Sequence, residues 1–173
     1  LAQELQILLA DEDAQLDRER GLDHGAWAVL KEMFPKANIP VVQMSIDRTR
    51  SFREHFDIGK KLQRLRYKGV LIIGSGNLVH NLREISQEED ATPQGWATKF
   101  DDWLADKIRN RDIEALLNPY HHEDTVSRAA SPTTEHYLPL LYSMGASLES
   151  DPISFPCLGI QHGSISMRSV RFG

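Results

Sequence analysis

The chain has 173 residues, of which 40% are hydrophobic and 26% charged, fractions typical of one globular domain with an apolar core. The net charge is −5 with neutral histidines, and the basic residues are scattered, which disfavours a nucleic-acid partner. The apolar runs are too short for a membrane-spanning helix, and the first residues lack the pattern of a secretion signal. A single cysteine excludes an internal disulfide and favours the cytoplasm.

The first half of the chain alternates helical and strand-like patterns. Apolar residues are spaced as in a helix over residues 1–9, 24–34 and 48–67. Short runs of β-branched residues occupy residues 39–46 and 70–73. This alternation predicts an α/β fold with a mostly parallel central sheet flanked by helices. His55 lies among charged residues, so we expect it on the surface.

The second half of the chain begins with a polar loop over residues 86–95, long enough to form a lid or rim. Residues 96–117 have helical periodicity, and Ser131 followed by Pro132 favours the start of a further helix. Residues 164–172 alternate apolar and polar side chains, which predicts an antiparallel edge strand. The expected organisation is therefore a single domain over residues 1–173. The chain begins at Leu1 without a methionine, so we expect this domain to be N-terminally incomplete.

His80 is the first candidate site residue. It follows the predicted strand of residues 70–73 and the small residues Gly74–Asn77. In open α/β sheets, ligands bind beyond the carboxyl ends of the strands, so His80 would be delivered to such a site. The alternative is a simple turn followed by a structural histidine, because glycine-serine-glycine alone is not a phosphate-binding or dinucleotide motif.

Two further histidines stand at predicted helix starts. His24 follows Asp23, and the positive end of a helix favours the neutral imidazole that can act as a base. The alternative is that Asp23 caps the helix and His24 fills a turn. His136 follows Glu135 near the predicted helix start at Ser131, and both side chains are metal ligands in other proteins; the alternative is a capping glutamate and a structural histidine.

The tract His121–Asp124 contains two histidines and two acidic residues. Neighbouring side chains point in different directions, so the four cannot converge on one ion. We interpret the tract as a solvated loop, with His121 or His122 at the rim of a site.

Three phrases together resemble one known family. They are GLDHGAW at residues 21–27, GSGNLVHNLR at residues 74–83 and PTTEHYLPLL at residues 132–141. In this order they look like the class III extradiol ring-cleavage dioxygenases, the LigB superfamily, with the closest likeness to the 4,5-DOPA extradiol dioxygenase branch. IPVVQMSID at residues 39–47 and GSISM at residues 163–167 match as well.

The resemblance implies a LigB-like fold and a metal-dependent dioxygenase that cleaves a catechol ring beside its hydroxyl pair with O₂. Fe(II) would support activity, although Zn(II) can occupy the site in this branch. By analogy His136 is a metal ligand, His80 is a ligand or the acid/base beside the metal, and His24 is a catalytic group that handles a proton. Assembly into a homo-oligomer is compatible with the sequence.

The sequence also departs from the family pattern. Members begin with a histidine-glycine-serine-proline phrase and a serine-alanine-histidine phrase that supply two metal ligands, and neither occurs here. A facial triad needs three protein ligands, so we expect residues 1–173 alone to bind metal poorly and to be inactive. A zinc-dependent hydrolase and a non-catalytic adaptor on the same scaffold remain the alternative functions.

Overall fold

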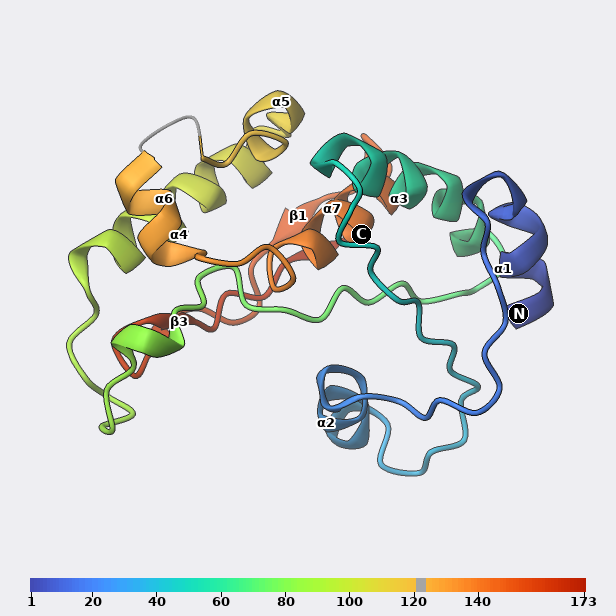
Figure 1. Ribbon diagram of the computed structural model, residues 1–173, viewed down its shortest axis with the longest axis horizontal. Helices are drawn as coiled ribbons and strands as arrows, with labels where there is room; N and C mark the ends of the chain where they lie inside the picture. The colour runs from blue at the N-terminus through green and yellow to red at the C-terminus, as the bar shows by residue number, and fades with distance from the viewer. Residues whose placement is uncertain (121–123) are drawn as a thin grey trace. The chain divides into compact units, whose positions relative to one another are not determined.

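The computed structural model of the protein describes residues 1–120 and 124–173, which form two compact units, Leu1–Thr49 and Arg50–Gly173 (Figure 1). The Leu1–Thr49 unit contains the helix α1 (Ala2–Leu8), the short 3₁₀ helix η1 (Ala10–Glu12) and the helix α2 (His24–Met33). Both predicted helices of this part of the chain are therefore confirmed. None of the described helices is both long and apolar enough to cross a membrane.

The Arg50–Gly173 unit is mainly helical. Its helices are α3 (Phe52–Arg66), η2 (Leu82–Glu84), α4 (Gly95–Arg109), α5 (Ile113–Leu116), α6 (Asp124–Ala130) and α7 (Leu138–Ala146). Its strands are β1 (Ile153–Ser154), β2 (Ile160–Gln161), β3 (Ile165–Ser166) and β4 (Arg171–Phe172). β1 pairs with β4 and β2 with β3, both in antiparallel register, so the chain end forms two short strands instead of the single predicted one.

The predicted parallel central sheet is not seen among the described residues, where the only sheets are these two antiparallel pairs. Residues 39–46 and 70–73 form neither strand nor helix. A strand requires backbone pairing as well as apolar side chains, and in residues 70–73 the Val70 N–H bonds only back to Leu65. Leu71 is 64% exposed, so this run is also not buried on both faces as predicted.

Helices α3 and α7 make the most extensive contact between two described elements of the Arg50–Gly173 unit, and Figure 1 shows them lying against each other. Two glycines allow this approach: a Cβ on Gly59 would lie 2.5 Å from the carbonyl oxygen of Tyr142, and a Cβ on Gly145 would strike the carbonyl of Phe56. His55 is 0% exposed at this interface and its Nδ1 lies 2.9 Å from the Tyr142 hydroxyl. The prediction of a surface position for His55 is therefore wrong, because α7 covers that side of α3.

Two other predicted helix boundaries are wrong. The helix expected over residues 96–117 is divided into α4 and α5, because Arg111 adopts a left-handed backbone conformation (φ +51°). The helix expected to start at Ser131 begins only at Leu138, since the Ser131 hydroxyl donates to the Thr133 carbonyl instead of capping a helix. Residues 132–137 therefore form turns that lead into α7.

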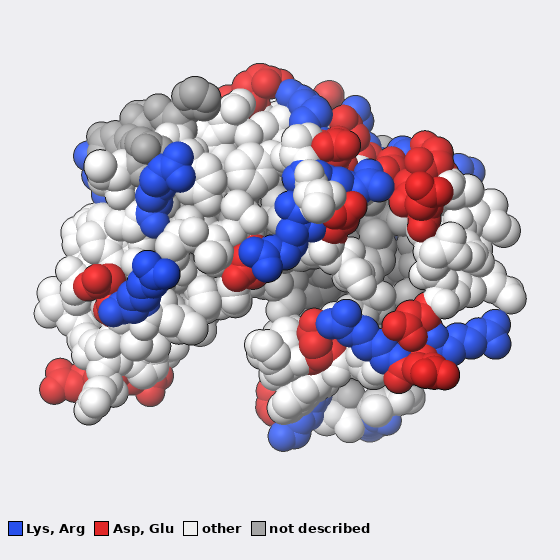
Figure 2. Space-filling view, in the orientation of Figure 1, with Lys and Arg blue, Asp and Glu red and all other residues white. Residues whose placement is uncertain are grey.

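Charge is mixed over the surface. On the face shown in Figure 2, lysine and arginine side chains stand beside acidic ones instead of gathering into one basic patch. That face therefore has no extended basic surface of the kind that binds nucleic acid, in agreement with the net charge of −5.

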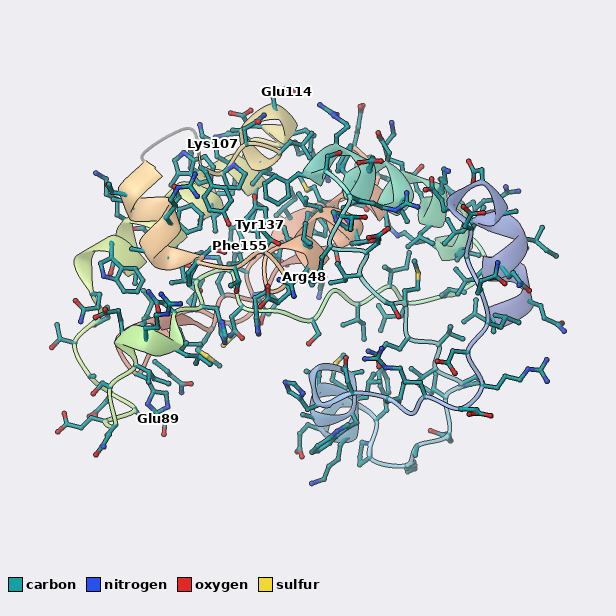
Figure 3. All side chains as sticks on the ribbon, viewed as in Figure 1. Arg48, Glu89, Lys107, Glu114, Tyr137 and Phe155 are labelled. Carbon is teal, nitrogen blue, oxygen red and sulfur yellow. The ribbon has the colours of Figure 1, made fainter. Side chains whose placement is uncertain are left out.

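Tyr137 anchors the turn before α7. Its ring lies inside the Arg50–Gly173 unit (Figure 3), and its hydroxyl donates to the Leu116 carbonyl at 2.6 Å. Burial raises the pKa of Tyr137 far above its ordinary value, so the hydroxyl stays protonated. We predict that Tyr137→Phe lowers the free energy of unfolding by about 1–2 kcal/mol, because the Leu116 carbonyl loses its partner.

Urea unfolding of the complete protein measures this loss, and Tyr67→Phe is the matched control because Tyr67 is 75% exposed. Equal effects of the two substitutions would contradict an anchoring role for Tyr137.

Candidate functional site

The candidate site begins with a close contact between a glycine-rich loop and the turn before α7. A Cβ on Gly76 would strike the carbonyl oxygen of His136 and lie 3.1 Å from its Cα, and a Cβ on Gly74 would strike the Pro139 carbonyl. Only glycine permits the two backbones to approach this closely. The loop over residues 74–77 is therefore fixed directly on the segment that carries His136.

This contact brings His80 and His136 together. Their rings are stacked, with centroids 3.6 Å apart and planes 14° apart. The two residues are 56 positions apart in the sequence, and both are partly exposed. The structure thus places side by side the two histidines that the sequence analysis selected as metal or catalytic residues.

His80 is held from two sides through its backbone. Its N–H donates to the carbonyl of Ala130 at the end of α6 (2.8 Å), and it forms an isolated antiparallel bridge with Ile165 of β3. The preceding residues Leu78 and Val79 are buried, so the segment is anchored in the core just before the histidine emerges.

Asn77 connects the loop to both β3 and His136. Its side-chain amide donates to the Ser166 carbonyl at 2.9 Å, and its backbone N–H points to Nδ1 of His136 at 3.4 Å. Ser166 in turn donates its hydroxyl to the buried carboxylate of Asp101 at 2.6 Å, and Arg168 pairs with the same carboxylate through two nitrogens. A buried ion pair with these extra hydrogen bonds gives β3 a fixed position under the loop.

The electrostatic setting favours a neutral His80. Burial lowers the pKa of His80, and the nearby carboxylate of Glu135 opposes that shift. An imidazole whose pKa is lowered in this way is unprotonated near neutral pH, and an unprotonated ring nitrogen can accept a proton.

The described residues supply only part of the three protein ligands that a facial-triad metal site needs. His80 and His136 provide two imidazole donors, yet residues 1–120 and 124–173 contain no group of three histidine, cysteine, aspartate or glutamate side chains that could hold a metal ion. The nitrogen lone pairs of the two stacked rings also lie in nearly parallel planes, so they do not converge on one metal ion. The pair alone therefore does not fit a complete metal centre.

His24 lies in the other compact unit, Leu1–Thr49, where it is the exposed first residue of α2. Asp23 caps this helix by accepting from the Ala26 N–H at 3.1 Å, as one of the sequence interpretations expected. Gln43 accepts a further hydrogen bond from the Asp23 N–H, and its Nε2 donates to the Asp23 carboxylate at 2.6 Å. The bond from the Gln43 amide, followed by the one from the Ala26 N–H, lowers the pKa of the Asp23 carboxyl. The catalytic role of His24 stays a prediction, as does the rim position of His121 or His122, which lie outside the described residues.

Sequence reasoning missed the groups that support the pair. Asn77 lies inside GSGNLVHNLR at residues 74–83, where its residue type indicates only a turn. Ser166, Asp101 and Arg168 gave no signal, because their contact joins positions 65 residues or more apart.

Comparison with known proteins places the whole chain in one group. A family model described as the catalytic LigB subunit of aromatic ring-opening dioxygenase matches residues 2–172. A relative from Escherichia coli (strain K12) named 4,5-DOPA dioxygenase extradiol is 44% identical over 177 residues, which cover 100% of this chain and 65% of the relative. A relative of the same name from Portulaca grandiflora is 36% identical over 98% of this chain and 62% of its own length.

A solved structure is also similar. The crystal structure of an uncharacterized protein from Escherichia coli K12 matches with a TM-score of 0.92 and 43% identity, covering 99% of this chain and 71% of that one. The chain spans less than two thirds of the length of the two curated relatives described above.

The Gly76 contact leads to a test of the histidine pair. We predict that Gly76→Ala forces the loop away from the His136 carbonyl, costs about 1–3 kcal/mol of stability and separates the two rings. The NMR resonances of the His80 and His136 ring protons report the separation, because stacked rings shift each other's signals.

Gly21→Ala is the control, since a Cβ at Gly21 meets nothing within 4 Å. Unchanged ring-proton resonances in Gly76→Ala would show that the close contact is not what holds the histidines together.

Proposed function

Because this chain belongs to the family of the catalytic LigB subunit of aromatic ring-opening dioxygenase, we propose that the protein is a metal-dependent dioxygenase that cleaves a catechol ring in extradiol fashion. In this reaction both atoms of O₂ enter the product, and the carbon–carbon bond beside the hydroxyl pair breaks. The observation that supports the proposal most strongly is the stacked pair of His80 and His136. A catechol such as DOPA is the proposed substrate, in keeping with the names of the relatives.

The proposal gives each histidine a role. His136 is a metal ligand, and His80 is either a further ligand or the acid/base next to the substrate. The lowered pKa of His80 supports the second role, because one of its nitrogens can then accept the proton of a catechol hydroxyl. His24 is proposed as a second catalytic group that transfers a proton.

Fe(II) is the proposed metal for activity, and Zn(II) is proposed as an alternative occupant. The metal would bring the catechol oxygens and O₂ together in reactive orientation. The two described histidines are not a complete ligand set, so the proposal includes at least one further ligand besides them.

The remaining parts of the proposal concern organisation. Residues 1–173 would act within one catalytic domain, and the protein would work in the cytoplasm, which the single cysteine supports. A homo-oligomer is compatible with the proposal, and its test is the molecular mass in solution.

The test is O₂ consumption by the complete protein. The protein is reconstituted anaerobically with Fe(II) and mixed with L-DOPA, and the yellow ring-opened product is followed with the O₂ uptake. We predict one O₂ consumed per substrate, and a loss of at least about a hundredfold in His136→Ala and in His80→Ala. His162→Ala is the matched control, because His162 bonds to the Ser86 carbonyl and is not part of the pair.

Absence of uptake with L-DOPA and with simple catechols, despite tightly bound zinc, would overturn the proposal in favour of a zinc-dependent hydrolase. Absence of both uptake and metal would favour a non-catalytic adaptor.

A further inference from the structure

We propose that Asn81 is a positioning residue that aims the His80 ring at His136; its effect on turnover rests on the proposed function, whereas its effect on geometry does not. Asn81 is 7% exposed and follows His80 directly. Its backbone is extended (φ −127°, ψ 94°), and side chains of consecutive extended residues point to opposite sides. Burial along residues 79–81 follows this alternation, since Val79 and Asn81 are buried and His80 is partly exposed.

Both the nitrogen and the oxygen of the Asn81 side-chain amide form hydrogen bonds. Its Nδ2 donates to the Ala129 carbonyl at 2.7 Å, and its Oδ1 accepts from the Arg83 N–H at 3.0 Å. Ala129 and Ala130 end α6, where helical carbonyls lack partners within their own helix. Asn81 and the His80 N–H therefore cap the end of α6 together, one through its side chain and the other through its backbone.

The opposite side of Asn81 is held by the turn before β3. The buried Ser164 hydroxyl donates to the Asn81 carbonyl at 3.0 Å, and the Asn81 N–H points to the Ser164 carbonyl at 3.4 Å. Asn81 thus joins α6 to the segment that leads into β3. A shift of one residue in this register would place His80 inside and Asn81 outside, so the buried amide selects the register in which His80 faces His136.

The inference is tested with Asn81→Asp. The substitution keeps the size of the side chain but replaces the Nδ2 donor by an oxygen that repels the Ala129 carbonyl. In the metal-free complete protein, we predict that the stacking shift of the His80 ring-proton resonances is lost, as it is in His136→Ala. In the Fe(II)-loaded protein, kcat falls by about a hundredfold while KM changes by less than about twofold, because the catalytic group is displaced and the binding groups are not.

Asn110→Asp is the matched control. Asn110 is an exposed asparagine whose Nδ2 donates to Asp106, and its substitution leaves the His80 resonances and kcat unchanged. If Asn81→Asp does not fold, Ser164→Ala removes one hydrogen bond from the other side of Asn81 and gives a smaller change of the same kind.

Wild-type resonances and kcat in Asn81→Asp, or in Ser164→Ala where Asn81→Asp does not fold, would overturn the inference. A wild-type protein that does not consume O₂ would overturn the proposed function alone, because the resonance measurement needs neither metal nor substrate.

Discussion

The site depends on the contact between the glycine loop and the backbone of His136. No side chain larger than hydrogen fits at Gly76, since a Cβ would strike the His136 carbonyl. This contact joins two segments that are 60 residues apart, and it sets how near the residues after the loop come to the turn before α7. The stacked histidines and the bond from the Asn77 N–H to His136 Nδ1 lie at this contact, and the His80 N–H joins it to the end of α6.

Rigid support on both sides makes the contact useful for chemistry. Beneath the loop, the Asp101–Arg168 pair fixes Ser166, and Ser166 fixes Asn77. On the other side, α7 is packed tightly on α3 through Gly59 and Gly145, and Tyr137 bonds to Leu116. A reactive group must be held within fractions of an ångström, and here buried polar networks and close helix packing provide that restraint.

Apolar periodicity is a local signal, so the sequence predicted α1, α2 and α3, although it merged α4 with α5 and began α7 too early. His80 was selected because it follows a predicted strand and a glycine-rich turn, and His136 because it lies near a predicted helix start. The family resemblance then assigned both histidines to one site. The parallel central sheet is not seen among the described residues, because an apolar run such as residues 70–73 indicates neither a pairing partner nor, with Leu71 64% exposed, a buried position. His55 was misplaced for the same reason, since α7 covers it from 87 positions away.

The supporting groups could not be predicted from local patterns. Asn81 and Asn77 are ordinary turn residues in the sequence, and their roles depend on which carbonyls lie opposite them in the fold. The left-handed Arg111, which divides α4 from α5, also gave no warning, because glycine and asparagine are the usual residues at such positions.

The most direct test of the account is an anomalous-scattering map from crystals of the complete protein loaded with Fe(II) under anaerobic conditions. The account predicts an iron peak at bonding distance from a nitrogen of His136, about 2.1 Å, with the His80 ring next to it. Iron held by residues that include neither histidine would contradict the assignment of this pair as the active site.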